Sequence, residues 1–269
     1  MSQNQLFKQF SLLFLIFTLT SSVAQNQSRV LTLSSIQKIE ADQFLGFDVL
    51  GNLYYIKNNE IIKENENQIW RYKNMALGKI TRVDFLNPLK ILLFYEDFNT
   101  VIMLDNQLNE IQKLNFSDYS SPLMVGAIGI ASQNRFWIYD LLSQQIGLFD
   151  YLKNTFQTIT PSFQSAIKHY ESNFNSFQWI DGKNNRYTCD NFGKVTTIGT
   201  VTDFDKIQFI DNEMVLFSKE GKLYLQHIQN QKCYPIVTDD KSFESFYYKD
   251  QILAIFTATE IKNYKITIP

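Results

Sequence analysis

The sequence predicts an all-β chain that folds as a six-bladed β-propeller, and three observations lead to this prediction. Short runs of apolar, β-branched and aromatic residues alternate with turn formers along the chain. These units start near residues 44, 80, 125, 167, 206 and 243, about 36 to 45 residues apart, a period typical of four-stranded blades. The last unit lacks one strand and the first is preceded by an unpaired one, so pairing the two closes a ring of six blades.

The clearest unit lies between Gly78 and Phe116. Its second strand, Lys90–Tyr95, is apolar on both faces, so both faces of this sheet should be covered. A propeller blade meets this requirement because it packs face to face with the blades before and after it. The four strands expected in this unit are Ile80–Asp84, Lys90–Tyr95, Thr100–Asp105 and Ile111–Phe116.

The other units follow the same pattern in chain order. The unpaired strand is Arg29–Ile39, which alternates apolar and polar residues and is expected on the outer edge of the last blade. The expected strands are Phe44–Asp48, Leu53–Lys57, Glu60–Lys63 and Gln68–Tyr72 in the first unit; Val125–Ala131, Arg135–Tyr139, Gln145–Asp150 and Thr155–Thr160 in the third; a strand from near Ala166, Ser176–Ile180, Asn185–Cys189 and Lys194–Gly199 in the fourth; Lys206–Ile210, Glu213–Ser218, Lys222–His227 and Cys233–Val237 in the fifth; and Phe243–Tyr248, Gln251–Thr257 and Glu260–Ile268 in the last.

Residues 1–24 differ from the rest of the chain. Lys8 is their only charge, an apolar run follows from Phe10 to Thr20, and Ser22-Val23-Ala24 places small residues where signal peptidase cleaves. We therefore expect a secretory signal peptide over 1–24 and a single β-propeller domain over 25–269. An N-terminal membrane anchor is the alternative, but the apolar run is shorter than the roughly 20 residues of a spanning helix. No transmembrane segment is expected in the mature chain.

Composition limits the classes of function. The net charge is −2 and no long run of one sign is present, whereas a nucleic-acid binder normally carries a basic face. Two cysteines, Cys189 and Cys233, are expected to stay unpaired and half-buried, although the oxidising compartment of an exported protein permits a disulfide bond between them. The two histidines, His169 and His227, fall in different units, and only His169 is placed to face a central channel. No catalytic motif accompanies them, so no catalytic residue and no cofactor are assigned.

A short stretch resembles known propellers. Asp48-Val-Leu-Gly-Asn-Leu-Tyr-Tyr is similar to the Asp-x-x-Gly-Asn-x-Tyr stretch found in the blades of NHL-like propellers. The six-bladed architecture also resembles lactonases and gluconolactonases, which hold a divalent cation with oxygen ligands from inner strands. This resemblance implies an alternative function, a metal-dependent lactonase-like hydrolase. The acids on or beside expected inner strands that would supply the metal ligands are Asp48, Asp84, Glu171 and Asp211.

Aromatic residues suggest a partner surface. Tyr95, Asp97 and Phe98 fall in or beside a predicted loop, where an exposed aromatic side chain has few structural reasons to be. The tryptophans Trp70, Trp137 and Trp179 sit at similar strand positions in three units, which favours packing between blades. We expect Tyr95, Asp97 and Phe98 to bind a partner.

The leading functional hypothesis is therefore an exported, non-catalytic propeller that acts as a protein-interaction scaffold in the periplasm or at the outer membrane. Its expected partner is a protein of the cell envelope. Composition, with many Asn and Phe residues, and the stretch from Asn87 to Asn99 also resemble uncharacterised secreted proteins of Bacteroidota-type bacteria.

Overall fold

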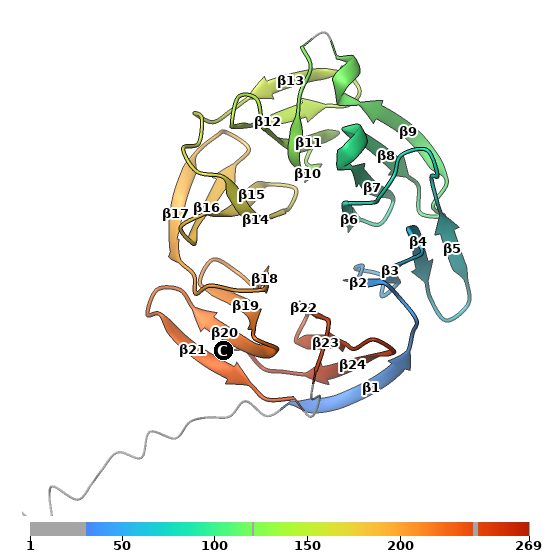
Figure 1. Cartoon of the computed structure of the whole chain (residues 1–269), viewed down its shortest axis with the longest axis vertical. Helices are drawn as coiled ribbons and strands as arrows, with labels where there is room; N and C mark the ends of the chain where they lie inside the picture. Colours follow the sequence, from blue (N-terminus) through green and yellow to red (C-terminus); the bar gives the residue numbers. More distant parts are fainter. Residues whose placement is uncertain (1–30, 120, 239–241, 269) are drawn as a thin grey trace, which may run out of the picture.

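The structure is a computed structural model that describes residues 31–119, 121–238 and 242–268. The expected signal peptide, 1–24, lies outside the described residues. Six four-stranded antiparallel sheets are arranged in a ring, which confirms the predicted six-bladed β-propeller (Figure 1). Within the described ranges the helical segments are two 3-10 turns, η1 (Glu96–Phe98) and η2 (Phe116–Asp118), and no helix has the length and hydrophobicity needed to cross a membrane.

Five blades are continuous in sequence, and each runs from its inner to its outer strand. Blade I contains β2 (Gln43–Phe47), β3 (Leu53–Lys57), β4 (Glu60–Glu64) and β5 (Ile69–Tyr72); blade II contains β6 (Arg82–Asn87), β7 (Lys90–Tyr95), β8 (Thr100–Leu104) and β9 (Glu110–Asn115); blade III contains β10 (Val125–Ala131), β11 (Arg135–Asp140), β12 (Gln145–Asp150) and β13 (Thr155–Thr158); blade IV contains β14 (Ile167–Ser172), β15 (Ser176–Asp181), β16 (Asn185–Asp190) and β17 (Val195–Thr200); blade V contains β18 (Lys206–Phe209), β19 (Met214–Lys219), β20 (Lys222–His227) and β21 (Lys232–Ile236).

Blade VI is built from both ends of the described chain. Its strands β22 (Ser245–Lys249), β23 (Ile252–Phe256) and β24 (Glu260–Lys265) are completed by β1 (Thr32–Lys38), which pairs antiparallel with β24. In Figure 1 the blue β1 lies along the outer side of the red β24. The predicted closure of the ring by the N-terminal strand is therefore confirmed.

The core is divided among the six boundaries between adjacent blades, each of which holds one hydrophobic cluster. Strand β7 shows why its sequence is apolar on both faces: Leu92 and Phe94 pack toward blade III, whereas Ile91, Leu93 and Tyr95 pack toward blade I. Burial of two such faces supplies most of the stabilisation of a blade, because each apolar side chain removed from water contributes about 1.5–3 kcal/mol.

The expected packing of the tryptophans and cysteines is confirmed in part. Trp137 and Trp179 are buried between blades III and IV, and Trp70 is half-buried against the cluster between blades I and II. Both cysteines are unpaired, as expected, but they are not both half-buried: Cys189 is buried and Cys233 is exposed.

The chain direction defines two faces of the ring. Every inner strand starts at the end where the link from the preceding blade arrives, and the turn between the second and third strands of each blade returns to that same end. We call this side the crossover face; it carries the links 39–42, 73–81 and 201–205 among others. The turns between first and second strands, and between third and fourth strands, form the opposite face.

Candidate functional site

The predicted partner-binding residues separate into one buried and two exposed side chains. Tyr95 is the last residue of β7 and is 0% exposed, so the expectation that it contributes to a surface is wrong. Its position explains the error, because the strand keeps its inter-blade packing to its final residue. Asp97 and Phe98 lie in η1 on the crossover face; both are exposed, with Phe98 at 48%.

Phe98 belongs to a larger apolar patch. The ring packs beside Gly78, where an added Cβ atom would lie 3.3 Å from Phe98 Cε2, and Gly78 follows the exposed Met75 in the same link. On the other side, the Asn99 side-chain amide donates to Leu123 O at 2.6 Å, next to the exposed Met124. We name the following exposed residues of blades I to III the apolar patch: Met75, Phe98, Met124, Leu141 and Leu142.

Backbone contacts fix the geometry of the patch. Leu141 N–H donates to Met124 O at 2.7 Å, and the Leu141 side chain lies over Gly126. Val125 N–H donates to Asn99 Oδ1 at 3.1 Å, and Asn99 itself adopts a left-handed conformation that Asn tolerates. The loops that carry the patch are thus joined to one another, so the apolar side chains are presented on a preorganised surface.

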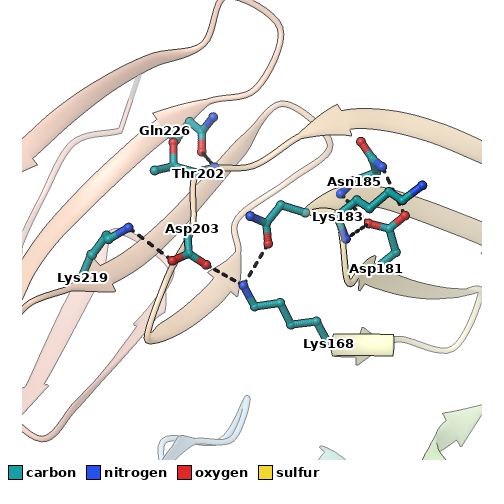
Figure 2. A network of polar contacts seen from close by, with 9 residues as sticks. Lys168, Asp181, Lys183, Asn185, Thr202, Asp203, Lys219 and Gln226 are labelled. Atoms are coloured by element: carbon teal, nitrogen blue, oxygen red, sulfur yellow. Dashed lines mark hydrogen bonds and ion pairs between the residues drawn. The ribbon is translucent and has the colours of Figure 1, made fainter. Parts of the chain in front are cut away.

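The crossover face changes character over blades IV and V. Asp203, in the link between β17 and β18, accepts from Lys168 Nζ at 2.7 Å and from Lys219 Nζ at 3.3 Å, as Figure 2 shows. Hydrogen bonds from the two lysines lower the pKa of Asp203 to about 2. The crossover face thus carries the apolar patch over blades I to III and a Lys–Asp–Lys network over blades IV and V.

The four acids proposed as metal ligands do not all lie at one place in the structure. Asp84 and Glu171 lie on the inner strands β6 and β14 and line one central cavity, whereas Asp48 and Asp211 lie in turns that follow β2 and β18. Within the described ranges, no group of three or more His, Cys, Asp or Glu side chains could hold a metal ion. Two of the four acids therefore meet at the central cavity, and the other two lie in turns outside its lining.

The Asp48 side chain forms hydrogen bonds within the turn that follows β2. Its Oδ1 accepts from Asn52 N–H at 2.9 Å, and its Oδ2 accepts from Asn52 Nδ2 at 2.8 Å and from Tyr54 OH at 3.2 Å. Asp181 repeats this arrangement in blade IV, with Asn185 and Tyr187 as partners. The Asp-x-x-Gly-Asn-x-Tyr pattern is thus a turn motif, in which a carboxylate satisfies the backbone and the two later side chains.

Asp211 has a similar local role. Its Oδ1 accepts from Glu213 N–H at 2.7 Å and from Met214 N–H at 2.9 Å, so it closes the turn between β18 and β19. The side chain lies on an exposed turn of the opposite face, outside the lining of the central cavity.

The central cavity has a volume of about 440 Å³ and is lined by inner-strand residues of blades I, II, IV, V and VI. Asp84 is 8% exposed and accepts from Leu86 N–H at 2.9 Å and from Ile130 N–H at 2.8 Å, so it joins blade II to blade III. Burial raises the pKa of Asp84 above its ordinary value, while those two N–H groups and Arg82 act in the opposite direction.

Blade III leaves room for its neighbours. At Gly129 of β10 an added Cβ atom would lie 1.9 Å from Ser172 Oγ and 3.2 Å from Asp84 Oδ2. Side chains of blades II and IV therefore meet over Gly129, and Figure 1 shows β10 between β6 and β14 around the ring. The Arg82 guanidinium of blade II also contacts blade IV, with its Cζ atom 4.6 Å from the centre of the Tyr170 ring.

The far wall of the cavity carries His169 and Glu171. His169 Nε2 lies 3.2 Å from Glu171 Oε1, which also accepts from Phe209 N–H at 2.9 Å. His169 does line the cavity, as its sequence position predicted. Behind this wall the fully buried Arg186 donates to Gln178 Oε1 at 2.6 Å, and burial lowers its pKa to about 10, with Glu171 and Asp211 opposing that shift.

Sequence reasoning missed most of these residues. Arg82, Tyr170 and Ser172 come from two blades and are brought together by the absence of a side chain at Gly129, which no local pattern reports. For the apolar patch, apolar residues do recur in links and in second-to-third-strand turns, which share one face of any propeller, but they recur in the turns of the opposite face as well, as at Leu50 and Phe192.

The comparisons with known proteins establish the architecture. No protein-family model and no curated protein matches the sequence. Among solved structures, the Cps50 (Swd1) β-propeller domain of Myceliophteria thermophila is 10% identical, with a TM-score of 0.59 over 88% of this chain and 100% of that one. A member of the DUF4221 family from Bacteroides vulgatus is 8% identical, with a TM-score of 0.58 over 90% and 99% of the two chains.

A third similar structure is an inactive virginiamycin B lyase from Staphylococcus aureus with quinupristin. It is 9% identical, with a TM-score of 0.57 over 87% of this chain and 99% of that one. Proteins of such different descriptions share this fold, so the likeness shows the propeller and leaves the function to be argued from the residues of this chain.

Proposed function

We propose that this protein is an exported, non-catalytic propeller that binds another protein of the cell envelope through its crossover face. The observation that carries the proposal is the apolar patch, five exposed apolar side chains on loops of three adjacent blades. Exposed apolar residues that cluster on a protein surface mark interaction sites. The opposite face also exposes apolar side chains, such as Leu50 and Phe192, so the proposal rests on the contacts that join the loops of the apolar patch. The hydrogen bonds between these loops reduce the entropy that ordering them would cost on binding.

Charge at the edge of the patch suggests the chemistry of the partner. Glu96 and Asp97 are exposed in η1 beside Phe98, and neither forms an ion pair with a described residue. A partner that presents apolar side chains flanked by Lys or Arg would bury the former against Phe98 and place the latter beside these carboxylates. Such rim charges act mainly on the association rate and on specificity.

Export to the periplasm or outer membrane is part of the proposal. It is supported by the pattern of residues 1–24, with an apolar run and small residues before Gln25. Amino-terminal sequencing of the protein purified from its native cells tests this point. A mature chain that begins at Gln25 is expected, and a chain that retains Lys8 would contradict cleavage.

The partner surface is tested by affinity purification of the tagged protein from its native envelope after mild crosslinking, with mass spectrometry. A stoichiometric envelope protein should accompany the wild type and be lost from the double variant Phe98→Ser, Leu142→Ser. The matched control is Leu50→Ser, Phe192→Ser, which changes exposed apolar residues on the opposite face. If the partner binds both variants equally, or only the control loses it, the crossover face is not the partner surface.

A further inference from the structure

We propose that the central cavity is a binding site for a small monocarboxylate that also carries hydroxyl or amino hydrogen-bond donors. Arg82 would bind the carboxylate and Glu171 would accept from the donors. The site is distinct from the apolar patch, and the proposal does not depend on the protein-binding function.

Arg82 is an available cation in this cavity. It is the first residue of β6 and half-buried, and its guanidinium forms no hydrogen bond or ion pair with a described residue. Its Cζ atom lies 4.6 Å from the centre of the Tyr170 ring, and this contact leaves the guanidinium donors without hydrogen-bond partners among the described residues. An arginine held in this way presents a planar fork of N–H groups, which matches the two oxygens of a carboxylate.

The acid nearest to Arg82 does not neutralise it by a direct pair. Both oxygens of Asp84 accept backbone N–H groups, and Arg82 acts on it only through its charge, which favours a lower pKa of Asp84, without an ion pair between the two described residues. Two lysines at the crossover ends of other inner strands have acceptors of their own: Lys168 binds Asp203, and Lys206 Nζ donates to Glu244 O. Arg82 is thus set apart by its position in the cavity and by its lack of an acceptor.

A second polar atom in the same place has no partner. Ser172 Oγ is buried, lies over Gly129 close to Asp84, and forms no hydrogen bond with a described residue. A buried hydroxyl without a partner costs about 1–3 kcal/mol. Because Ser172 and Arg82 line the same cavity, a ligand or a water molecule that it orders would satisfy the hydroxyl.

The charges around the cavity narrow the ligand class. Asp84 and Glu171 would repel a multiply charged anion such as phosphate, whereas a monocarboxylate brings only the charge that Arg82 offsets. Glu171 uses Oε1 for Phe209 N–H and His169, so its second oxygen remains to accept from a donor of the ligand. Hydrogen bonds from donor groups of the ligand to Glu171 would offset the repulsion between this acid and the carboxylate of the ligand.

The dimensions fit a small molecule. A volume of about 440 Å³ lies within the range of roughly 300–1,000 Å³ of ligand pockets. The lining combines the aromatic residues Phe85, Phe246 and Tyr247 with the polar groups described above. Aromatic side chains beside convergent polar groups are typical of sites that orient a ligand.

The test is isothermal titration calorimetry of the whole mature protein with lactate, gluconate, serine and acetate, and with lactamide as the uncharged match of lactate. At least one of lactate, gluconate and serine should bind, more tightly than acetate, and lactamide should bind at least about tenfold more weakly than lactate, as expected for loss of a charged hydrogen bond. Binding by none of the carboxylates, or equal binding of lactamide and lactate, would overturn the proposal.

The variants separate this site from non-specific binding. Arg82→Gln should weaken the carboxylate that binds by about tenfold or more, and Arg82→Lys should weaken it less because the charge remains. Arg71→Gln is the matched control, since Arg71 is exposed on the outer strand β5 and pairs with Glu60. Melting temperatures show whether each variant is folded. If both Arg82→Gln and Arg82→Lys are folded and bind the carboxylate as tightly as the wild type, the proposed site is contradicted.

Discussion

The aromatic ring of Tyr247 fills the space that a side chain at Gly46 would occupy. A Cβ atom on Gly46 would lie 2.7 Å from both Cδ2 and Cε2 of Tyr247, and the Tyr247 hydroxyl donates to Phe47 O at 3.0 Å. These residues belong to β22 and β2, the inner strands of the last and first blades. Their contact therefore closes the inner circumference of the ring, as the pairing of β1 with β24 closes the outer one.

Replacing Gly46 by Ala should destabilise this closure. Gly46 has a φ of +134°, which side-chain-bearing residues rarely adopt, and the methyl group would displace the Tyr247 ring. We expect a loss of about 3 kcal/mol in the free energy of unfolding, measured by chemical denaturation. Gly51→Ala is the control, because Gly51 has a φ of +81° but no atom within 4 Å of an added Cβ, so about 1 kcal/mol is expected there. Equal losses would show that the ring contact is unimportant.

Tyr95 and Phe98 should respond to substitution in opposite ways although they lie three residues apart. Tyr95→Ala would empty a fully buried site between blades I and II, at a cost of about 3–5 kcal/mol. Phe98→Ala should cost less than about 1 kcal/mol, because that side chain is half exposed. Thermal denaturation of the two variants checks this contrast.

Tyr95→Phe separates the two properties of the buried ring. The Tyr95 hydroxyl has no hydrogen-bond partner among the described residues, and burial raises its pKa above the ordinary value. Removing an unsatisfied hydroxyl while keeping the ring should leave stability unchanged or slightly increased. A marked loss in Tyr95→Phe would indicate that the hydroxyl is satisfied in solution.

The fold could be predicted from the sequence because its determinants are local. Turn formers recur at the blade period. A strand such as Lys90–Tyr95 is apolar at successive positions, which predicts that both of its faces are buried. The first strand has no partner and the last blade lacks a strand, so pairing the two is the arrangement that leaves no exposed sheet edge at the ring closure. Each step uses residues close together in the chain.

The candidate sites could be predicted only in part because they depend on contacts between blades. Acids beside inner strands look alike in sequence, yet Asp84 turns toward β10 and the cavity while Asp48 folds back on its own turn. Arg82 reaches the cavity and Tyr170 across a glycine more than forty positions away from it. Phe98 was identified because a loop aromatic is unusual by itself, whereas Met75 and Leu142 gain meaning only as its neighbours.

Asp48→Ala should reduce stability whether or not metal is present. The Asp48 carboxylate accepts from Leu50 N–H, Asn52 N–H, Asn52 Nδ2 and Tyr54 OH, so its removal leaves several buried donors without acceptors. We expect a loss of about 3 kcal/mol in the free energy of unfolding. A chelator should not change the wild-type melting temperature if Asp48 acts only in its turn; a chelator effect that disappears in Asp48→Ala would instead restore this residue as a metal ligand.

The Asp203 network should make stability depend on pH at the acid end. Hydrogen bonds from Lys168 and Lys219 lower the pKa of Asp203 from 3.8 to about 2 in the folded chain (Figure 2). Because the folded pKa is the lower one, the stabilisation is fully present above pH 3.8 and is lost as the pH falls from 3.8 to about 2. The melting temperature of Asp203→Asn should therefore lie below that of the wild type at neutral pH and approach it across this window.

Salt and a matched variant isolate the contribution of this network. Both lysine–aspartate pairs are solvent-exposed, so high ionic strength should narrow the difference between wild type and Asp203→Asn at neutral pH. Asp97→Asn changes an exposed carboxylate without an ion pair on the same face, and it should leave the melting temperature unchanged. A gap between wild type and Asp203→Asn that persists at pH 2 and in high salt would mean that Asp203 stabilises the link by something other than its charge.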